Sequence, residues 1–196
     1  MTISRGDIAY YLKPFVHIGL IVMLLGFKSF DAIYQKRIII SIFICMFADL
    51  ALSWNENSFV VGMILFLIGH IGFITSYLKL NKKLDLWLLL LFILWSSGLL
   101  FFLWNNLNDF KIPVTVYATV ISLMMWRAAS NLSQDFQLNT LLAMVGAILF
   151  AFSDSIIAIN KFYTELSFSA QIIIIVTYWL ALLLIAISSL SWNKVK

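Results

Sequence analysis

Two aspartates lie deep within apolar stretches of this chain and could act as a pair. Asp49 and Asp154 each lie near the end of such a stretch, about a hundred residues apart, with polar residues just beyond. Acids within membrane spans are costly and usually face a bundle interior or an aqueous cavity. The alternative is a protonated carboxyl that hydrogen-bonds a neighbouring helix. Two carboxyls sharing a poorly hydrated site would supply one acid and one base at neutral pH, as a hydrolase requires.

Other polar side chains are candidates to support the two acids. His70 lies mid-segment, where it acts either as an orienter or proton relay, or as a histidine satisfied by a neighbouring carbonyl or hydroxyl. Tyr117 and Tyr178 could each point a hydroxyl at the same cavity, although Tyr117 also fits an interface tyrosine. Lys13 lies shallowly in the first apolar segment, where it either snorkels to the headgroups or receives a lipid phosphate.

The sequence lacks the residues that a zinc site, a phosphate-binding loop or a serine nucleophile would need. The two histidines, His17 and His70, lie in different segments and a three-histidine zinc site is impossible, so no metal is expected. The chain has no phosphate-binding glycine loop and no Gly-x-Ser-x-Gly elbow, so neither a cofactor nor serine nucleophile chemistry is indicated.

The elements that position these residues follow from composition. Of the 196 residues, 63% are hydrophobic and only 11% charged, which indicates an integral membrane protein. The basic residues are scattered between apolar runs, so nucleic-acid binding is not expected. A span needs roughly 20 apolar residues, and the pattern predicts one transmembrane domain, residues 1–196, an all-α bundle of about seven helices. The predicted spans are Ile8–Phe27, Ile38–Ser53 (starting near Tyr34), Phe59–Leu80, Leu84–Trp104, Ile112–Ala129, Leu138–Ile159 and Phe168–Trp192.

The distribution of Lys and Arg predicts the orientation. An outside N-terminus and a cytoplasmic C-terminus place nine basic residues inside and four outside, in agreement with the positive-inside rule. The nine are Lys28, Lys36, Arg37, Lys79, Lys82, Lys83, Arg127, Lys194 and Lys196. Asp49 and Asp154 then share a depth about one helical turn inside the outer boundary.

A weak internal repeat accounts for this matched depth. Pro14 and Pro113 open the first and fifth spans, and the two aspartates occupy matching places in the second and sixth. The match predicts two parallel three-helix units joined by the fourth span and related by an axis along the membrane normal. Such an axis would bring the aspartates face to face.

Several motifs in this order and spacing resemble the YhhN-type lysoplasmalogenases. The resemblance extends from about Lys13 to Leu190 and rests on Lys13-Pro14, Phe47-Ala48-Asp49, Gly62 with Gly69-His70, Pro113 with Tyr117 and Ile121-Ser122-Leu123-Met124, Phe152-Ser153-Asp154, Asn160 and Tyr178. It implies hydrolysis of the vinyl ether bond of a lysoplasmalogen, a lysophospholipid, to a fatty aldehyde and a glycerophospho headgroup.

The resemblance also implies roles. Asp49 and Asp154 would be catalytic, with supporting or substrate-binding roles for Lys13, His70, Tyr117, Ser153, Asn160 and Tyr178. We expect a multi-pass protein of a bacterial inner membrane whose partners are the lysophospholipid and the bilayer, with no protein partner inferred.

Three departures from the family pattern stand out. Ala48 replaces the usual glycine before the aspartate, Phe73 replaces a frequent aromatic hydroxyl, and an extra N-terminal span common in members is not expected here. The rival interpretation is a proton-coupled small-solute transporter, because parallel repeats and paired acids also occur in carriers.

Overall fold

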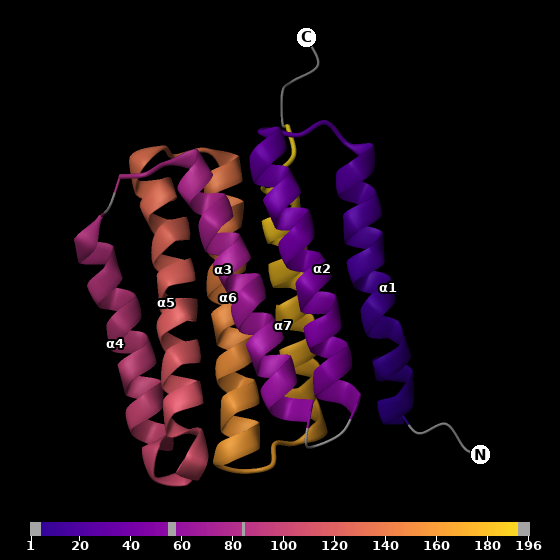
Figure 1. The fold of residues 1–196 in the computed structure, drawn as a ribbon, viewed down its shortest axis with the longest axis vertical. Coiled ribbons are helices and arrows are strands. Elements are labelled where there is room, and N and C mark those ends of the chain that lie inside the picture. Colours follow the sequence, from indigo (N-terminus) through magenta and orange to yellow (C-terminus); the bar gives the residue numbers. More distant parts are fainter. Residues whose placement is uncertain (1–4, 55–57, 84, 192–196) are drawn as a thin grey trace.

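Seven α-helices make up most of the described chain. The computed structural model describes residues 5–54, 58–83 and 85–191, with side chains from residue 14 onward. The helices are α1 (Arg5–Gly26), α2 (Ala32–Trp54), α3 (Phe59–Leu80), α4 (Leu86–Leu103), α5 (Lys111–Gln134), α6 (Leu138–Phe162) and α7 (Phe168–Ile187), with 3-10 turns η2 (Trp104–Asn106) and η3 (Asn108–Phe110) between α4 and α5 (Figure 1).

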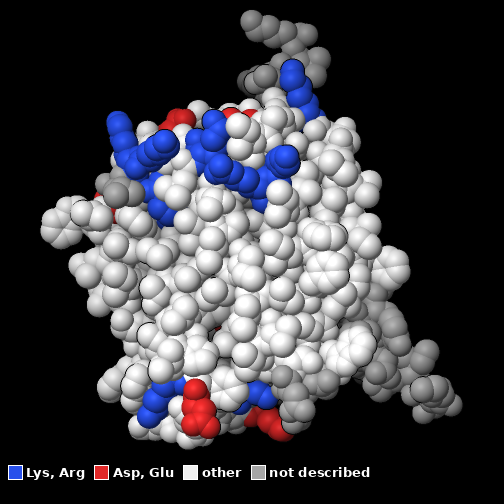
Figure 2. Space-filling view, in the orientation of Figure 1, with Lys and Arg blue, Asp and Glu red and all other residues white. Residues whose placement is uncertain are grey.

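The helices are those of a membrane bundle. Among the described residues, the six helices from α2 to α7 are long and apolar enough to cross a membrane, and α1 contributes a shorter apolar stretch, Pro14–Gly26. Charged side chains gather at the two ends of the molecule and leave an apolar belt between them (Figure 2). The prediction of an all-α, multi-pass membrane protein is therefore confirmed.

The helix arrangement agrees with the predicted repeat. α2 packs on α3 as α6 packs on α7, α1 packs on α2 as α5 packs on α6, and α3 meets α5 as α7 meets α1. In Figure 1, α2 and α3 lie in front of α6 and α7, α1 and α5 lie on opposite flanks, and α4 lies outside α5. A two-fold rotation about the long axis thus relates α1–α2–α3 to α5–α6–α7, with α4 as the linker. Pro113 lies in the first turn of α5, whereas Pro14 lies inside α1, so the predicted proline match holds only for the fifth helix.

Glycines on α3 permit its close contact with α2. A Cβ at Gly69 would lie 2.7 Å from the Cys45 sulfur, and one at Gly62 would lie 3.1 Å from the Ala48 carbonyl oxygen. Small residues on this face therefore let the two helix backbones approach closely. The close contact also fixes the rotation of α3, and with it the direction in which neighbouring His70 points.

Several helix ends differ from the sequence prediction by a few residues, and the C-terminal ends of α5 and α7 differ most. α5 was expected to end at Ala129 but continues to Gln134, because the Asn131 amide donates to the Tyr77 carbonyl oxygen (2.9 Å) and can therefore be buried. α7 ends at Ile187 rather than continuing toward Trp192, which lies outside the described residues.

The α7 end is closed by backbone pairing with the α1–α2 loop. Phe30 N–H donates to the Ser189 carbonyl (2.8 Å), and Ser191 N–H donates to the Lys28 carbonyl (2.9 Å). These bonds satisfy groups that a helix terminus leaves unpaired.

α2 begins at Ala32, slightly before the expected start near Tyr34. The Asp31 carboxylate accepts the Tyr34 backbone N–H at 2.8 Å, as in a helix N-cap. That hydrogen bond, together with Lys79 at 3.6 Å, holds the pKa of Asp31 below its usual value.

Candidate active site

One cluster of polar side chains surrounds Asp154 between α3, α5 and α6. The Tyr117 hydroxyl donates to Asp154 Oδ2 at 2.5 Å, and His70 Nε2 lies 3.8 Å from the same oxygen. The Asp154 side chain is 10% exposed and His70 is fully buried. Three helices therefore contribute one acid, one phenol and one imidazole.

The His70 imidazole is held by aromatic rings. Within the described residues neither of its ring nitrogens has a hydrogen-bond partner. Its ring instead meets Phe150 edge-on at 4.7 Å between centroids and Tyr117 at 5.3 Å. A buried nitrogen facing a carboxylate just beyond hydrogen-bond distance could interact with it after a small shift or through a water.

A second cluster surrounds Asp49 between α1, α2 and α7. His17 Nε2 lies 3.0 Å from the Tyr178 hydroxyl and 3.5 Å from Asp49 Oδ2. All three side chains are buried. The Tyr178 hydroxyl also interacts with the Asp49 carboxyl, so each member of this cluster contacts the other two.

The two clusters follow the two-fold arrangement of the helices. Each contains one Asp, one His and one Tyr. The rotation places α1, α2 and α7 of the Asp49 cluster where α5, α6 and α3 stand in the Asp154 cluster. Each cluster thus takes two residues from one repeat and its third from the other, so each cluster needs both repeats.

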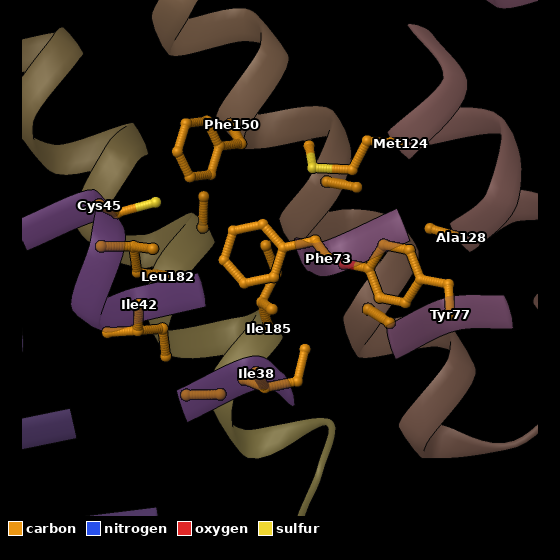
Figure 3. Close-up of a cluster of buried hydrophobic side chains, with 14 of the residues drawn as sticks. Ile38, Ile42, Cys45, Phe73, Tyr77, Met124, Ala128, Phe150, Leu182 and Ile185 are labelled. Carbon is orange, nitrogen blue, oxygen red and sulfur yellow. The ribbon is translucent and has the colours of Figure 1, made fainter. Parts of the chain in front are cut away.

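Aromatic rings lie between the clusters. Phe150 contacts both His70 (4.7 Å) and Tyr178 (5.2 Å), and Phe66 contacts Phe150 and Tyr178, each at 5.9 Å. Figure 3 shows Phe150 at the edge of the core, beside Phe73. The two carboxyls nevertheless lie close enough for their charges to interact. The site is therefore two linked half-sites, with an aromatic layer between them.

Asp154 also lines an apolar pocket. This first pocket lies between α2, α3, α5 and α6, and Tyr117 and Asp154 lie in its wall among apolar side chains such as Met63 and Phe66. Phe59 and Phe162 close it near the helix ends. A small hollow opens in the lower half of the apolar belt on this face of the molecule (Figure 2). An apolar ligand in this pocket would contact the carboxyl group of Asp154.

The remaining predicted site residues lie around the clusters. The Ser153 hydroxyl donates to the Ile174 carbonyl (3.0 Å) and joins α6 to α7, and the Asn160 carbonyl oxygen accepts the Leu166 N–H (2.8 Å) in the α6–α7 loop. Lys13 lies in α1, and its side chain falls outside the part of the chain that the structure describes. The structure thus gathers Asp49, Asp154, His70, Tyr117 and Tyr178, and gives Ser153 and Asn160 hydrogen bonds elsewhere.

His17 is the site residue that the sequence reasoning missed. The sequence carries a signal for it, because a mid-span histidine is an ionisable group in the membrane. His17 was considered only as a metal ligand, and its partners are far away in the sequence, with Tyr178 161 residues distant.

The two substitutions among the three family departures lie beside the site. Ala48 precedes Asp49 and is fully buried at the α2–α3 contact, where its carbonyl faces Gly62. Phe73 is also fully buried and packs on Phe150, with ring centroids 6.2 Å apart. The Phe150 ring therefore lies between Phe73 and His70 of the Asp154 cluster.

Comparisons with known proteins agree with the sequence resemblance. A lysoplasmalogenase TMEM86A from Bos taurus is 33% identical over 159 residues, which cover 78% of this chain and 65% of that protein. A lysoplasmalogenase from Mycobacterium bovis is 34% identical over 120 residues (58% of this chain, 44% of that protein). Lysoplasmalogenase TMEM86B from Homo sapiens is 33% identical over 143 residues (72% and 58%).

The chain spans less than two thirds of the length of each of these three relatives. No solved structure matches it. The sequence model of the YhhN family matches residues 8–189, nearly the whole chain. The chain therefore belongs to the YhhN family.

Proposed function

We propose that the protein hydrolyses the vinyl ether bond of lysoplasmalogens, with Asp154 as the proton donor and Asp49 as its ionised partner. The carrying observation is the Asp154 carboxyl, hydrogen-bonded to Tyr117 in the wall of an apolar pocket inside the bundle. The relatives named lysoplasmalogenase support the substrate class. A buried acid beside an apolar pocket suits a reaction in which a hydrocarbon chain carries the bond to be cleaved.

The proposed reaction begins with proton transfer to carbon. Asp154 donates its proton to the second alkenyl carbon, and the first alkenyl carbon becomes an oxocarbenium ion. Water adds to this cation and passes a proton back to Asp154. The resulting hemiacetal then collapses to a fatty aldehyde and the glycerol hydroxyl of the headgroup. One water is consumed, and the enzyme carboxyl returns to its starting state.

Asp49 acts as the ionised member of the pair. It lies outside the pocket wall, but its charge interacts with the Asp154 site, so it favours a positive charge developing on the substrate. His17 and Tyr178 hold this carboxyl in place through the short contacts of their cluster. Asp154 then touches the substrate, and Asp49 acts across the aromatic layer.

The direct test is aldehyde release by the purified protein. We expect aldehyde from a lysoplasmalogen and no fatty acid from the matching 1-acyl lysophospholipid, because protonation of carbon requires the alkene. The absence of aldehyde from every vinyl ether lipid offered would overturn the proposal.

A second candidate is a proton-coupled small-solute transporter, which the parallel three-helix repeat favours. It predicts solute flux into proteoliposomes without aldehyde release. The mostly apolar lining beside Asp154 favours a substrate that carries a hydrocarbon chain over a solute that is polar throughout.

We further propose that the protein resides in a bacterial inner membrane with its N-terminus outside. The basic side chains at the end where α3 meets α4, including Lys79, Lys82 and Lys83, outnumber Lys111 and Lys161 at the opposite end (Figure 2). This orientation places Asp154 in the outer half of the bilayer.

The orientation can be measured with introduced cysteines. Thr164 and Gln134 are exposed at opposite ends of the bundle. In intact cells a membrane-impermeant maleimide should label Thr164→Cys, and it should label Gln134→Cys only after lysis. The native Cys45 is buried, and the unmodified protein serves as the background control. The reverse labelling pattern would contradict the proposed orientation.

A further inference from the structure

A second apolar pocket lies behind the Tyr117–Asp154 pair. This second pocket lies between α4, α5 and α6. Small side chains, Ala118 on α5 and Ala151 and Ser155 on α6, leave the space free. The first and second pockets share Val114, Tyr117, Asp154 and Ala158, so Asp154 lies in the wall of both.

The linings of the two pockets overlap along α6 between Asp154 and Ala158, and each extends beyond the overlap in one direction. The first pocket reaches Phe162 at the end of the helix, and the second reaches Ala151, eleven residues earlier. At 1.5 Å per residue this separation is about 16 Å, which is half the hydrocarbon thickness of a bilayer. Together the pockets trace a path from the membrane interface to the middle of the bundle, with Asp154 on the way.

We propose that the second pocket holds the hydrocarbon chain of the lysolipid substrate, an inference that rests on the proposed function. The reacting bond must lie at Asp154, and the headgroup must stay near water. The first pocket therefore takes the glycerol side of the bond, and the chain continues into the second pocket.

A basic residue stands where the headgroup phosphate would lie. The Lys161 ammonium lies 5.2 Å from the ring centroid of Phe59, which lines the first pocket. Lys161 is seven residues beyond Asp154, about 10 Å along the helix. This leaves room for the glycerol between a phosphate at Lys161 and a vinyl ether at Asp154.

The chain can reach the second pocket from the bilayer. α4 lies at one edge of the bundle, outside α5 (Figure 1), and it packs extensively on α5 but only sparsely on α6. Trp95 of α4 lines the pocket and is half exposed on the membrane-facing surface. The sparse contact between α4 and α6 gives a long chain a lateral way in.

The surrounding bilayer limits the binding free energy that the second pocket can contribute. Lipid tails are as apolar as the pocket wall, so moving a chain from one to the other gains little from the hydrophobic effect. The pocket therefore contributes chain positioning and shape selection. Narrowing it should harm substrates whose chains must enter it and spare substrates whose chains end before it.

The test compares chain lengths in a narrowed pocket. Ser155 is a suitable position, because its hydroxyl donates to the Ala151 carbonyl of its own helix (2.7 Å) and joins no other helix. For Ser155→Leu we expect kcat/KM for a hexadecenyl lysoplasmalogen to fall about tenfold, the cost of overpacking a filled site. The value for a butenyl analogue should change by less than about twofold.

Two further variants separate pocket filling from misfolding. Thr119→Leu adds a similar side chain on the exposed face of α5, outside both pockets, and should behave as wild type with both substrates. Leu99→Trp narrows the pocket from the peripheral helix α4 and should reproduce the chain-length effect without touching α6. An equal loss with both substrates, or no loss with the long one, would overturn the proposal.

A binding measurement tests whether the second pocket holds the hydrocarbon chain even if the protein does not cleave the lipid. An uncleavable alkyl lysophospholipid with a diazirine at its chain end should crosslink to α4 near Trp95 and Leu99, and Ser155→Leu should abolish this label. Specific labelling of an inactive wild-type protein would overturn the proposed function and leave the chain site standing. Labelling spread evenly over the membrane-facing helices would overturn the chain site.

Discussion

Asp154→Asn is expected to lower aldehyde release from lysoplasmalogen about a thousandfold, within the range that a general acid contributes. An amide cannot deliver a proton to the alkenyl carbon. It can still accept the Tyr117 hydroxyl through its carbonyl oxygen, so the cluster geometry should survive. The measurement is the rate of aldehyde formation at saturating substrate, with thermal unfolding in the same detergent.

The matched control for this change is Asp31→Asn. Asp31 lies at the start of α2 outside the site, and asparagine caps a helix as well as aspartate does. Its activity should stay within about twofold of wild type, because the same chemical substitution is made where no proton is transferred. An Asp154→Asn protein that keeps more than about a tenth of the wild-type rate would exclude Asp154 as the proton donor.

Asp49→Asn is expected to lower the same rate about a hundredfold, as for the loss of one preorganised electrostatic group. This variant keeps the size of the side chain and removes only its charge. The loss should be smaller than at Asp154, because Asp49 lies outside the pocket wall and acts across the aromatic layer. KM should change little, since the charge stabilises a cation that exists only after protonation.

The same assay distinguishes this role from a structural one. His17→Gln keeps a hydrogen-bonding group beside Tyr178 and leaves the Asp49 charge in place, so it should retain more activity than Asp49→Asn. Equal rates for Asp49→Asn and wild type would remove Asp49 from the mechanism. A loss at Asp49 equal to that at Asp154 would instead indicate that both carboxyls take part in proton transfer.

The two half-sites are alike in residue type but differ in access. Each contains an Asp, a His and a Tyr, but the His and the Tyr exchange places between the repeats: α1 carries His17 where α5 carries Tyr117, and α3 carries His70 where α7 carries Tyr178. Only the Asp154 cluster borders the two apolar pockets described above, which lie beside α5 and the linker helix α4. α4 has no counterpart in the other repeat, so it breaks the symmetry at this point. This asymmetry is the basis for assigning different roles to the two aspartates.

The sequence by itself determined the membrane bundle. Long apolar segments must satisfy every backbone polar group internally, so they form helices wherever they lie in the bilayer. Helix ends were less predictable, as α5 shows: the buried amide of Asn131 continues the helix because it finds the Tyr77 carbonyl, a partner that no local pattern reveals.

The sequence also identified the two aspartates, because a carboxyl within an apolar segment is rare: placing it in the membrane costs free energy. It likewise identified His70, Tyr117 and Tyr178 as candidate partners. Which of these surrounds which acid was decided by the rotation of each helix about its axis. Ser153 and Asn160 lie near Asp154 in the sequence, yet their hydrogen bonds go to α7 and to a loop.

Only the tertiary structure placed His17 between Asp49 and Tyr178, and Asp154 in the wall of two pockets. Periodicity along one helix shows which residues share a face, but not which neighbour that face will meet. In this bundle the neighbour is set by close packing at small residues such as Gly62 and Gly69, and by contacts between segments more than a hundred residues apart. The sequence therefore identified Asp49 and Asp154 as candidates. Helix packing placed Asp154 beside the pockets and Asp49 away from them.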